Sequence, residues 1–234
     1  MQTPLAELPH LQKRIIRDCI AGGLPVITAG QMLDSMVKVP TPTRAEATDV
    51  ANAVFDGTSG VMLSAETAIG AYPALSVATM ARIAETADDE FDHQLWAEQV
   101  AELRMAGPDD DDATMITDAI TIAAAQAAES VHVRAILCLS ESGFTVRSMA
   151  RFRPSALILG CSTNERTVRQ LASSWGVVPM LLETESPDYV ERVRVAVNLA
   201  KREGHLAPGD LIGVAAGISR AARATDTFRL LRVT

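Results

Sequence analysis

The 234-residue sequence lacks several features that mark large classes of proteins. Its three cysteines and four histidines lie far apart, so no pair has the spacing of zinc ligands. Aromatic residues make up 4% of the chain and the net charge is −8, which argues against a basic, ring-rich nucleic-acid surface. No apolar run approaches the roughly 20 residues that span a bilayer, and the first residues do not read as a signal peptide. We therefore expect a cytoplasmic globular protein without membrane or nucleic-acid partners, in which Cys138 and Cys161 are buried free thiols.

The clearest boundary along the chain is the segment GPDDDD at residues 107–112. Gly-Pro breaks a helix, and four adjacent like charges repel each other and stay solvated. Adjacent carboxylates are also oxygen ligands for a metal, but they converge on one ion only in a shaped loop. We expect a linker here, between a first domain at residues 1–106 and a second at residues 113–234.

The first half of the chain predicts two consecutive strand-plus-helix units. The apolar runs PVITA (25–29) and GVMLS (60–64) are the expected strands. Thr43 and Glu46 have the spacing of a capping box, which predicts that a helix begins there. A long helix is expected over residues 73–91.

The second half continues the alternation of apolar strands and helices. Strands are expected at 134–139, 156–161, 177–182, 211–217 and 228–233, and helices at 113–130, 143–152, 164–175 and 187–203. This alternation predicts an α/β fold with a mostly parallel five-stranded sheet. The link before the last strand is too short for a helix, so that strand is expected to be antiparallel.

The sequence has no Walker A loop and no G-x-G-x-x-G, so general motifs indicate no function. One long run, however, reads PVITAGQMLDSM, then PTPTRAEATDVANAVFDG, then VMLSAETAIGAYP. It closely resembles the pyruvate kinase motifs PVI-x-ATQMLESM, PTRAE-x-x-DVANAV-x-DG and MLSGETAxGxYP. The later stretch LSESGFTVRSMARFRPSALILGCS resembles the C-terminal domain of the same family.

The resemblance implies a fold in two parts. Residues 1–106 correspond to the last two β/α units of the family's eight-unit barrel, and residues 113–234 to its C-terminal α/β domain. The family's phosphoryl-stabilising lysine and its Mg²⁺-binding Glu and Asp precede the matched region. The resemblance thus implies phosphoryl transfer from phosphoenolpyruvate to ADP, giving pyruvate and ATP with Mg²⁺ and K⁺. It also implies that most of the active site, including the metal ligands, lies outside this sequence.

Gly30 occupies the position of the family's active-site threonine, whose hydroxyl takes part in proton transfer. Glycine has no hydroxyl, so that role is vacant here. The alternative explanation is structural, because glycine permits a tight turn after a strand.

Five further residues match family positions around the substrate: Gln31, Ser35, Arg44, Ser64 and Glu66. Each has a structural alternative as well. Arg44 lies in a first helical turn, where it can pair with a neighbouring acid, and Ser64 is placed to cap the next turn.

The segment SESGFT resembles the effector-phosphate loop of family members that sugar phosphates activate. It comprises Ser140, Glu141, Ser142, Gly143, Phe144 and Thr145. A hydroxyl-rich turn that opens a helix offers amides to an anion. Glu141 argues against this use, since bisphosphate-activated members often carry lysine there, and Phe144 removes a polar side chain. We therefore expect a structural turn.

Three interpretations of function remain open. The chain belongs to an active pyruvate kinase, or it is a non-catalytic remnant, or it is one part of a split enzyme whose other chain supplies the remaining barrel. The family commonly forms homo-oligomers. The strand residues Val26, Ile27, Val61, Met62 and Leu63 are expected to leave an apolar surface if no barrel closes over them.

Overall fold

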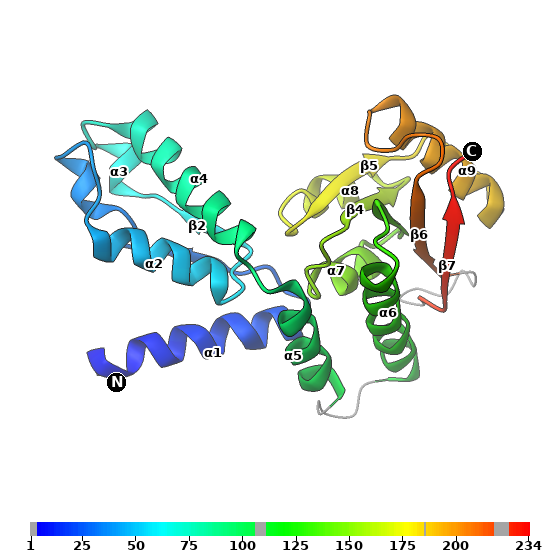
Figure 1. Cartoon of the computed structure of the whole chain (residues 1–234), viewed down its shortest axis with the longest axis horizontal. Coiled ribbons are helices and arrows are strands. Elements are labelled where there is room, and N and C mark those ends of the chain that lie inside the picture. The colour runs from blue at the N-terminus through cyan, green and yellow to red at the C-terminus, as the bar shows by residue number, and fades with distance from the viewer. Residues whose placement is uncertain (1–3, 106–110, 185, 218–224) are drawn as a thin grey trace. The chain divides into compact units, whose positions relative to one another are not determined.

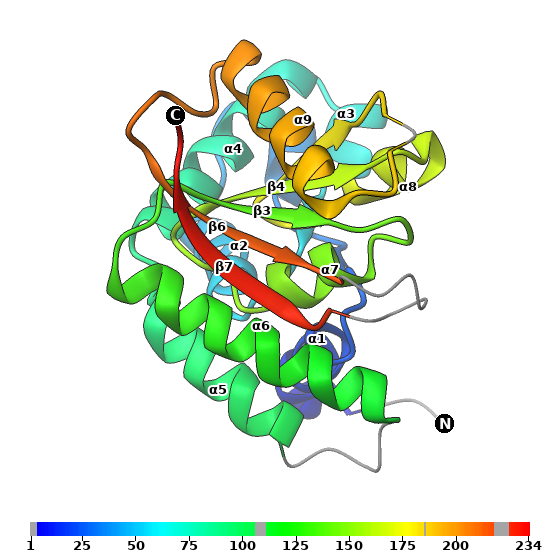
Figure 2. The same ribbon diagram turned by 90° about the vertical axis from the view of Figure 1, so that its right-hand side faces the viewer.

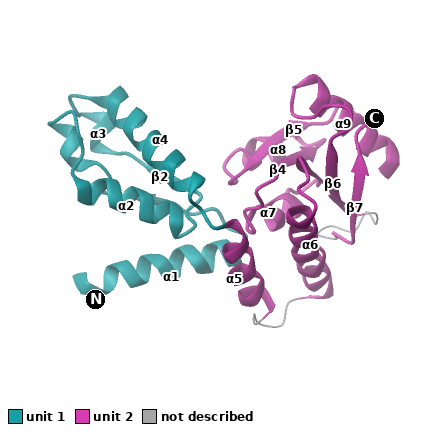
Figure 3. Cartoon of the chain, viewed as in Figure 1, with its two compact units in different colours: residues 1–92 teal, residues 93–234 magenta. Residues whose placement is uncertain are grey.

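The computed structural model describes residues 4–105, 111–184, 186–217 and 225–234. The chain forms two compact units, residues 1–92 and residues 93–234, shown in different colours in Figure 3. Among the described residues, no helix is both long and apolar enough to cross a membrane.

The first unit consists of two parallel strands with helices after each (Figure 1). Its elements are η1 (Leu5–Glu7), α1 (Leu8–Ala21), β1 (Ile27–Ala29), η2 (Asp34–Val37), α2 (Arg44–Phe55), β2 (Gly60–Met62), α3 (Ala65–Ala68) and α4 (Pro73–Asp89). The two strands pair in parallel, with Ile27 opposite Gly60 and Ala29 opposite Met62. The two β/α units expected from the sequence are confirmed, and the described residues do not close a barrel.

Local sequence sets where the helices of the first unit begin. The Thr43 hydroxyl accepts from the Glu46 amide, and the Glu46 side chain accepts from the Thr43 amide, so the predicted capping box is confirmed. Pro73 occupies the first turn of α4, where a missing N–H costs nothing. α2 and α4 then pack against each other around Met36, Val50 and other buried side chains.

The two faces of the small sheet differ in exposure. Val61 and Leu63 pack against the buried cluster between the helices. On the opposite face Ile27 is 62% exposed and Met62 is 46% exposed. The expectation that Val61 and Leu63 belong to the open apolar surface is therefore wrong, because side chains alternate between faces along a strand.

The second unit is a five-stranded α/β layer. Its elements are α5 (His93–Met105), α6 (Asp112–Ser130), β3 (Ala135–Leu139), α7 (Phe144–Ala150), β4 (Leu157–Ser162), α8 (Glu165–Leu171), β5 (Val177–Leu181), α9 (Tyr189–Arg202), β6 (Leu211–Ala216) and β7 (Thr227–Arg232). The strand order is β5-β4-β3-β6-β7, and β7 alone runs antiparallel to its neighbour in this sheet. The predicted mostly parallel sheet with an antiparallel last strand is confirmed.

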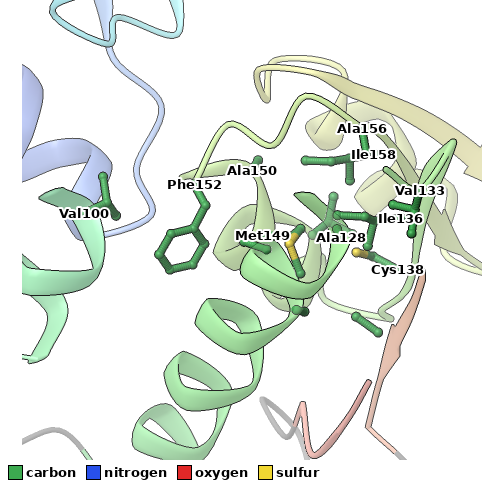
Figure 4. Packing of buried hydrophobic residues seen from close by; sticks show 14 of the residues in the cluster. Val100, Ala128, Val133, Ile136, Cys138, Met149, Ala150, Phe152, Ala156 and Ile158 are labelled. Atoms are coloured by element: carbon green, nitrogen blue, oxygen red, sulfur yellow. The ribbon is translucent and has the colours of Figure 1, made fainter. Parts of the chain in front are cut away.

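Helices cover both faces of this sheet. Figure 2 shows β4, β3, β6 and β7 side by side, with α6 on one side and α9 on the other. One core joins β3 and β4 to α5, α6 and α7, and Figure 4 shows Ile136, Cys138 and Met149 within it. The other core packs α9 on the opposite face and contains Cys161. Both cysteines are buried free thiols, as expected, and burial raises the pKa of the Cys138 thiol to about 12.

The division between the units falls earlier in the chain than the expected linker. α5 belongs to the second unit, where the Trp96 indole N–H donates to the Arg151 carbonyl at 2.8 Å. Most of the expected linker, residues 107–110, lies outside the described residues. Its last two positions start α6: Asp111 is the N-cap, whose carboxylate accepts from the Thr114 amide at 2.8 Å, and Asp112 is the first helical residue.

Candidate functional site

The candidate site lies where the two parallel strands of the first unit end. Since Ala29 is opposite Met62, β1 and β2 finish at the same edge of the sheet. Gly30 and Gln31 follow β1, whereas Ser64 and Glu66 follow β2. The carboxyl-terminal ends of the strands are the edge at which β/α barrels assemble their active sites. The fold thus brings residues that are more than 30 positions apart to one edge.

Gly30 and Gln31 form the turn that leaves β1. Gly30 has a φ of +92° and Gln31 has a φ of +54°. A Cβ added to Gly30 would meet no atom within 4 Å, so conformation rather than space favours glycine there. Gln31 is exposed, and its amide side chain lies at the surface of this edge.

Glu66 is buried, with 3% of its surface exposed. Its Oε1 accepts from the Leu33 amide at 3.0 Å, and its Oε2 accepts from the Ser64 amide at 2.8 Å. Burial by itself raises the pKa of this carboxyl. The amides of Glu66, Ser64 and Leu33 outweigh burial, so the pKa lies below its ordinary value. Glu66 is therefore an ionised acceptor that ties the end of β1 to the end of β2.

Ser35 is held by a second carboxylate, that of Glu46. The Ser35 amide donates to Oε1 at 2.7 Å, and the Ser35 hydroxyl donates to Oε2 at 2.6 Å. Oε2 also accepts from the Thr43 amide at 2.7 Å and the Thr43 hydroxyl at 2.8 Å. Burial raises the pKa of Glu46, but the donors from Ser35 and Thr43 outweigh it and lower the pKa to about 2.

Arg44 and Ser64 are exposed at the same end of the unit. Within the described part of the chain, the Arg44 guanidinium has no ion pair with an acidic side chain. The Ser64 hydroxyl makes no capping hydrogen bond to α3 in the described structure. The structural alternatives expected for these two side chains are therefore not seen in the described residues.

Glu46 and Glu66 do not by themselves fit a Mg²⁺ site. Mg²⁺ requires near-octahedral oxygen ligands, including carboxylates free to bind it. Both oxygens of Glu46 and both oxygens of Glu66 already accept hydrogen bonds from the protein. Within residues 4–105, 111–184, 186–217 and 225–234, no three acidic, His or Cys side chains gather as metal ligands do.

In the second unit, Glu141 is committed to contacts within the protein. Its carboxylate pairs with the Arg192 guanidinium and accepts from the Thr163 hydroxyl at 2.7 Å. Its carbonyl accepts from the Thr167 hydroxyl at 2.7 Å. These contacts fasten the loop after β3 to the segment after β4 and to α9.

The rest of this loop is a tight turn into α7. Gly143 has a φ of +75° and caps α7, and the Ser142 carbonyl accepts from the Arg147 guanidinium at 3.0 Å. The buried Thr145 hydroxyl shares a 2.7 Å hydrogen bond with the Thr225 hydroxyl. The remaining loop positions are the buried Ser140 and the half-buried Phe144.

We predict that Gly30→Ala destabilises the first unit by about 1–2 kcal/mol, because a Cβ strains a backbone with positive φ. Gly60→Ala is the matched control, since its Cβ would make only an ordinary 3.9 Å contact with Ile27. It should change stability by less than about 0.5 kcal/mol or increase it. Hydrogen exchange of the α2 amides reports the free energy of opening. Equal effects of the two substitutions would contradict the strained turn.

We also predict an acid-dependent contribution from Glu46. A folded-state pKa of about 2, against an ordinary 4.5, stabilises the fold above pH 4.5, and this stability is lost as pH falls toward 2. Because the group is partly exposed, the effect is about 1–2 kcal/mol. In Glu46→Gln the free energy of unfolding of the first unit should fall less between pH 5 and pH 2.5 than in the unchanged chain, as followed by hydrogen exchange. An unchanged pH slope in the variant would exclude this role.

Sequence reasoning missed the contact between Glu46 and the candidate site residue Ser35. The Thr-x-x-Glu spacing revealed its capping box but not its bonds to Ser35, which lies 11 residues earlier. No local signal predicts that a capping glutamate also reaches a preceding loop.

Comparison with known proteins gives a consistent family match. Residues 1–77 match the model of the pyruvate kinase barrel domain, and residues 118–231 match that of the pyruvate kinase alpha/beta domain. A pyruvate kinase of Clostridium acetobutylicum is 38% identical over 234 residues, which are 100% of this chain and 47% of that protein. Pyruvate kinase 2 of Synechocystis is 40% identical over 98% of this chain and 37% of its own length. The pyruvate kinase of Geobacillus stearothermophilus is 42% identical over 93% of this chain and 36% of its own length. The chain thus spans less than half the length of these relatives.

Proposed function

The chain belongs to the pyruvate kinase family, whose C-terminal portion it matches, and we propose that it contributes to phosphoryl transfer from phosphoenolpyruvate to ADP. In this proposal its first unit supplies the last two β/α units of an active-site barrel. The reaction gives pyruvate and ATP and is the glycolytic step of the family, which fits a cytoplasmic location.

The observation that carries the proposal is the common edge at which β1 and β2 end. Phosphoryl transfer is catalysed almost wholly by positioning and by compensation of charge. The exposed Arg44 guanidinium is suited to bind a phosphate or carboxylate oxygen of the substrate. The exposed Gln31 amide and Ser64 hydroxyl are suited to donate hydrogen bonds to the same ligand.

Other parts of the reaction must come from groups beyond these side chains. Gly30 has no hydroxyl, so it transfers no proton. The Ser35 hydroxyl already donates to Glu46 and orients the loop. We propose that Mg²⁺ and K⁺, which the family uses, are held by barrel residues outside this sequence, in the same polypeptide or in a second chain.

We further propose that the loop at residues 140–145 is a structural turn rather than a sugar-bisphosphate site. The Glu141 carboxylate would repel a phosphate, and it already neutralises Arg192. The hydroxyl of Thr145 is likewise engaged with Thr225 inside the protein.

Association is the second function that a specific observation favours. Ile27 and Met62 are exposed on a two-stranded sheet whose outer edges pair with no other described strand, which favours contact with another chain. We predict that residues 1–234 self-associate at micromolar concentration, as measured by light scattering during gel filtration. Ile27→Glu should reduce the association, whereas Ile69→Glu, at a position 80% exposed but outside the sheet, should not. A single 24.9 kDa species unchanged by tenfold concentration would contradict this prediction.

A fusion tests the catalytic proposal. The part of the Geobacillus stearothermophilus enzyme that precedes the matched region is joined to residues 1–234, and pyruvate formation is followed in a coupled assay. We expect turnover that requires both phosphoenolpyruvate and ADP and that neither part shows alone. The rate should be about 100-fold or more below that of the whole relative, because a proton-transfer group contributes on that scale. A folded fusion without turnover would refute the proposal.

A further inference from the structure

The segment from Gly30 to Val37 follows β1 and carries three of the candidate site residues, Gly30, Gln31 and Ser35. It begins with two positive φ values and contains only the short helix η2, so backbone hydrogen bonds of regular structure do little to fix it. Its apolar side chains, among them the fully buried Leu33, pack in the hydrophobic core of the first unit. Its polar groups need partners from elsewhere in the fold.

The first partner is the Glu66 carboxylate, which reaches this segment from α3. One oxygen accepts from the Leu33 amide and the other accepts from the Ser64 amide. A single side chain therefore fixes the backbone after β1 and the backbone after β2 relative to each other. Its burial, at 3% exposure, keeps water from competing for these amides.

The second partner is the Glu46 carboxylate, which reaches the segment from α2. It accepts both the amide and the hydroxyl of Ser35 while it closes the capping box with Thr43. The loop is consequently tied to both following helices, α2 through Glu46 and α3 through Glu66.

Only a carboxylate satisfies all of these donors. An ionised carboxylate accepts through both oxygens, whereas a glutamine has one accepting oxygen and an NH₂ group that donates. In a glutamine variant one of the backbone N–H groups would therefore face the side-chain NH₂ group, which is also a donor. The charge of Glu46 acts against ionisation of Glu66, so the amides must offset the repulsion between the two acids.

We propose that Glu46 and Glu66 are positioning residues that together hold the strand-end loop in the geometry required for substrate contact. The expected effect on turnover rests on the proposed function, whereas the positioning of the loop does not. In this role the two carboxylates act on the substrate only indirectly, through the amides and hydroxyls that they hold. Their role is to fix Gln31, Ser35 and Ser64 at one edge of the sheet.

Residue-resolved hydrogen exchange of residues 1–234 tests the positioning itself. Glu66→Gln should speed exchange of the Leu33 and Ser64 amides at least tenfold, and Glu46→Gln should do the same for Ser35. Glu85→Gln, an exposed glutamate on α4 of the same unit, is the matched control and should change none of them. Unchanged rates, or an equal rise throughout α2 and α4, would overturn the proposal.

The fusion with the Geobacillus stearothermophilus enzyme tests the consequence. Glu66→Gln should lower kcat at least tenfold, with a smaller change in KM for ADP, and Glu85→Gln should leave both unchanged. An active fusion whose kcat is unaffected by Glu66→Gln would refute the positioning role while the proposed function stands. An inactive fusion would refute the proposed function, and hydrogen exchange would still decide whether the two carboxylates hold the loop.

Discussion

Residues 1–234 expressed alone are expected to form no pyruvate from phosphoenolpyruvate and ADP above a blank without protein. Phosphoryl transfer requires metal ions and cations around the transferring group. The first unit offers Arg44, but the Glu46 and Glu66 carboxylates near the strand ends accept hydrogen bonds from amides and hydroxyls. Two strands also cannot assemble the set of strand ends that a barrel enzyme uses.

The measurement is a coupled assay with Mg²⁺, K⁺, phosphoenolpyruvate and ADP, at enzyme concentrations up to tens of micromolar. The fusion protein serves as the positive control. Turnover that rises in proportion to the purified chain and disappears in Arg44→Ala would contradict the expectation. Turnover that Arg44→Ala leaves unchanged would indicate a contaminating host enzyme.

Asp118→Ala is expected to destabilise the second unit by about 3–5 kcal/mol. Asp118 lies on α6 with 8% of its surface exposed, between two arginines. Arg104 on α5 donates from Nε to Oδ2 at 2.7 Å, and the Arg151 guanidinium pairs with Oδ1. Removal of this acid breaks two ion pairs at once, beside arginine side chains that are only 14% and 5% exposed, which is the costly way to break such a cluster.

Urea unfolding followed by tryptophan fluorescence measures this loss. Both tryptophans of the sequence, Trp96 and Trp175, lie in the second unit against the Arg153 guanidinium. Glu191→Ala is the control, because its ion pair with Arg194 is exposed to solvent and should leave the unfolding transition nearly unchanged. A change below 1 kcal/mol for Asp118→Ala would show that α5 is not fastened through this cluster.

The sequence predicted the regular elements that bury a continuous apolar side. The runs that became β3 and β4 are buried along nearly their whole length, so composition alone indicated strands. α5 was not predicted, because Val100 is its only buried residue and no apolar stripe marks the helix. Its place is decided by tertiary contacts, such as Arg104 with Asp118, which no local pattern reveals.

The residues of the candidate site come from the resemblance, and their role stays a prediction. Resemblance indicated Gln31, Arg44 and Ser64, and the structure places them at the same end of the first unit with exposed side chains. Glu66 was expected near the substrate, yet its oxygens hold backbone amides. This difference depends on how a loop folds back onto a helix more than 30 residues later, which periodicity and spacing do not encode.

A crystal structure of the fusion protein with oxalate and Mg²⁺ tests most directly whether this edge faces the substrate. Oxalate is a small dianion with the planar shape of enolpyruvate. We predict that it binds where β1 and β2 end, with at least one oxygen within about 3.5 Å of Gln31, Arg44 or Ser64. Oxalate bound in a site that none of these residues lines would contradict the account.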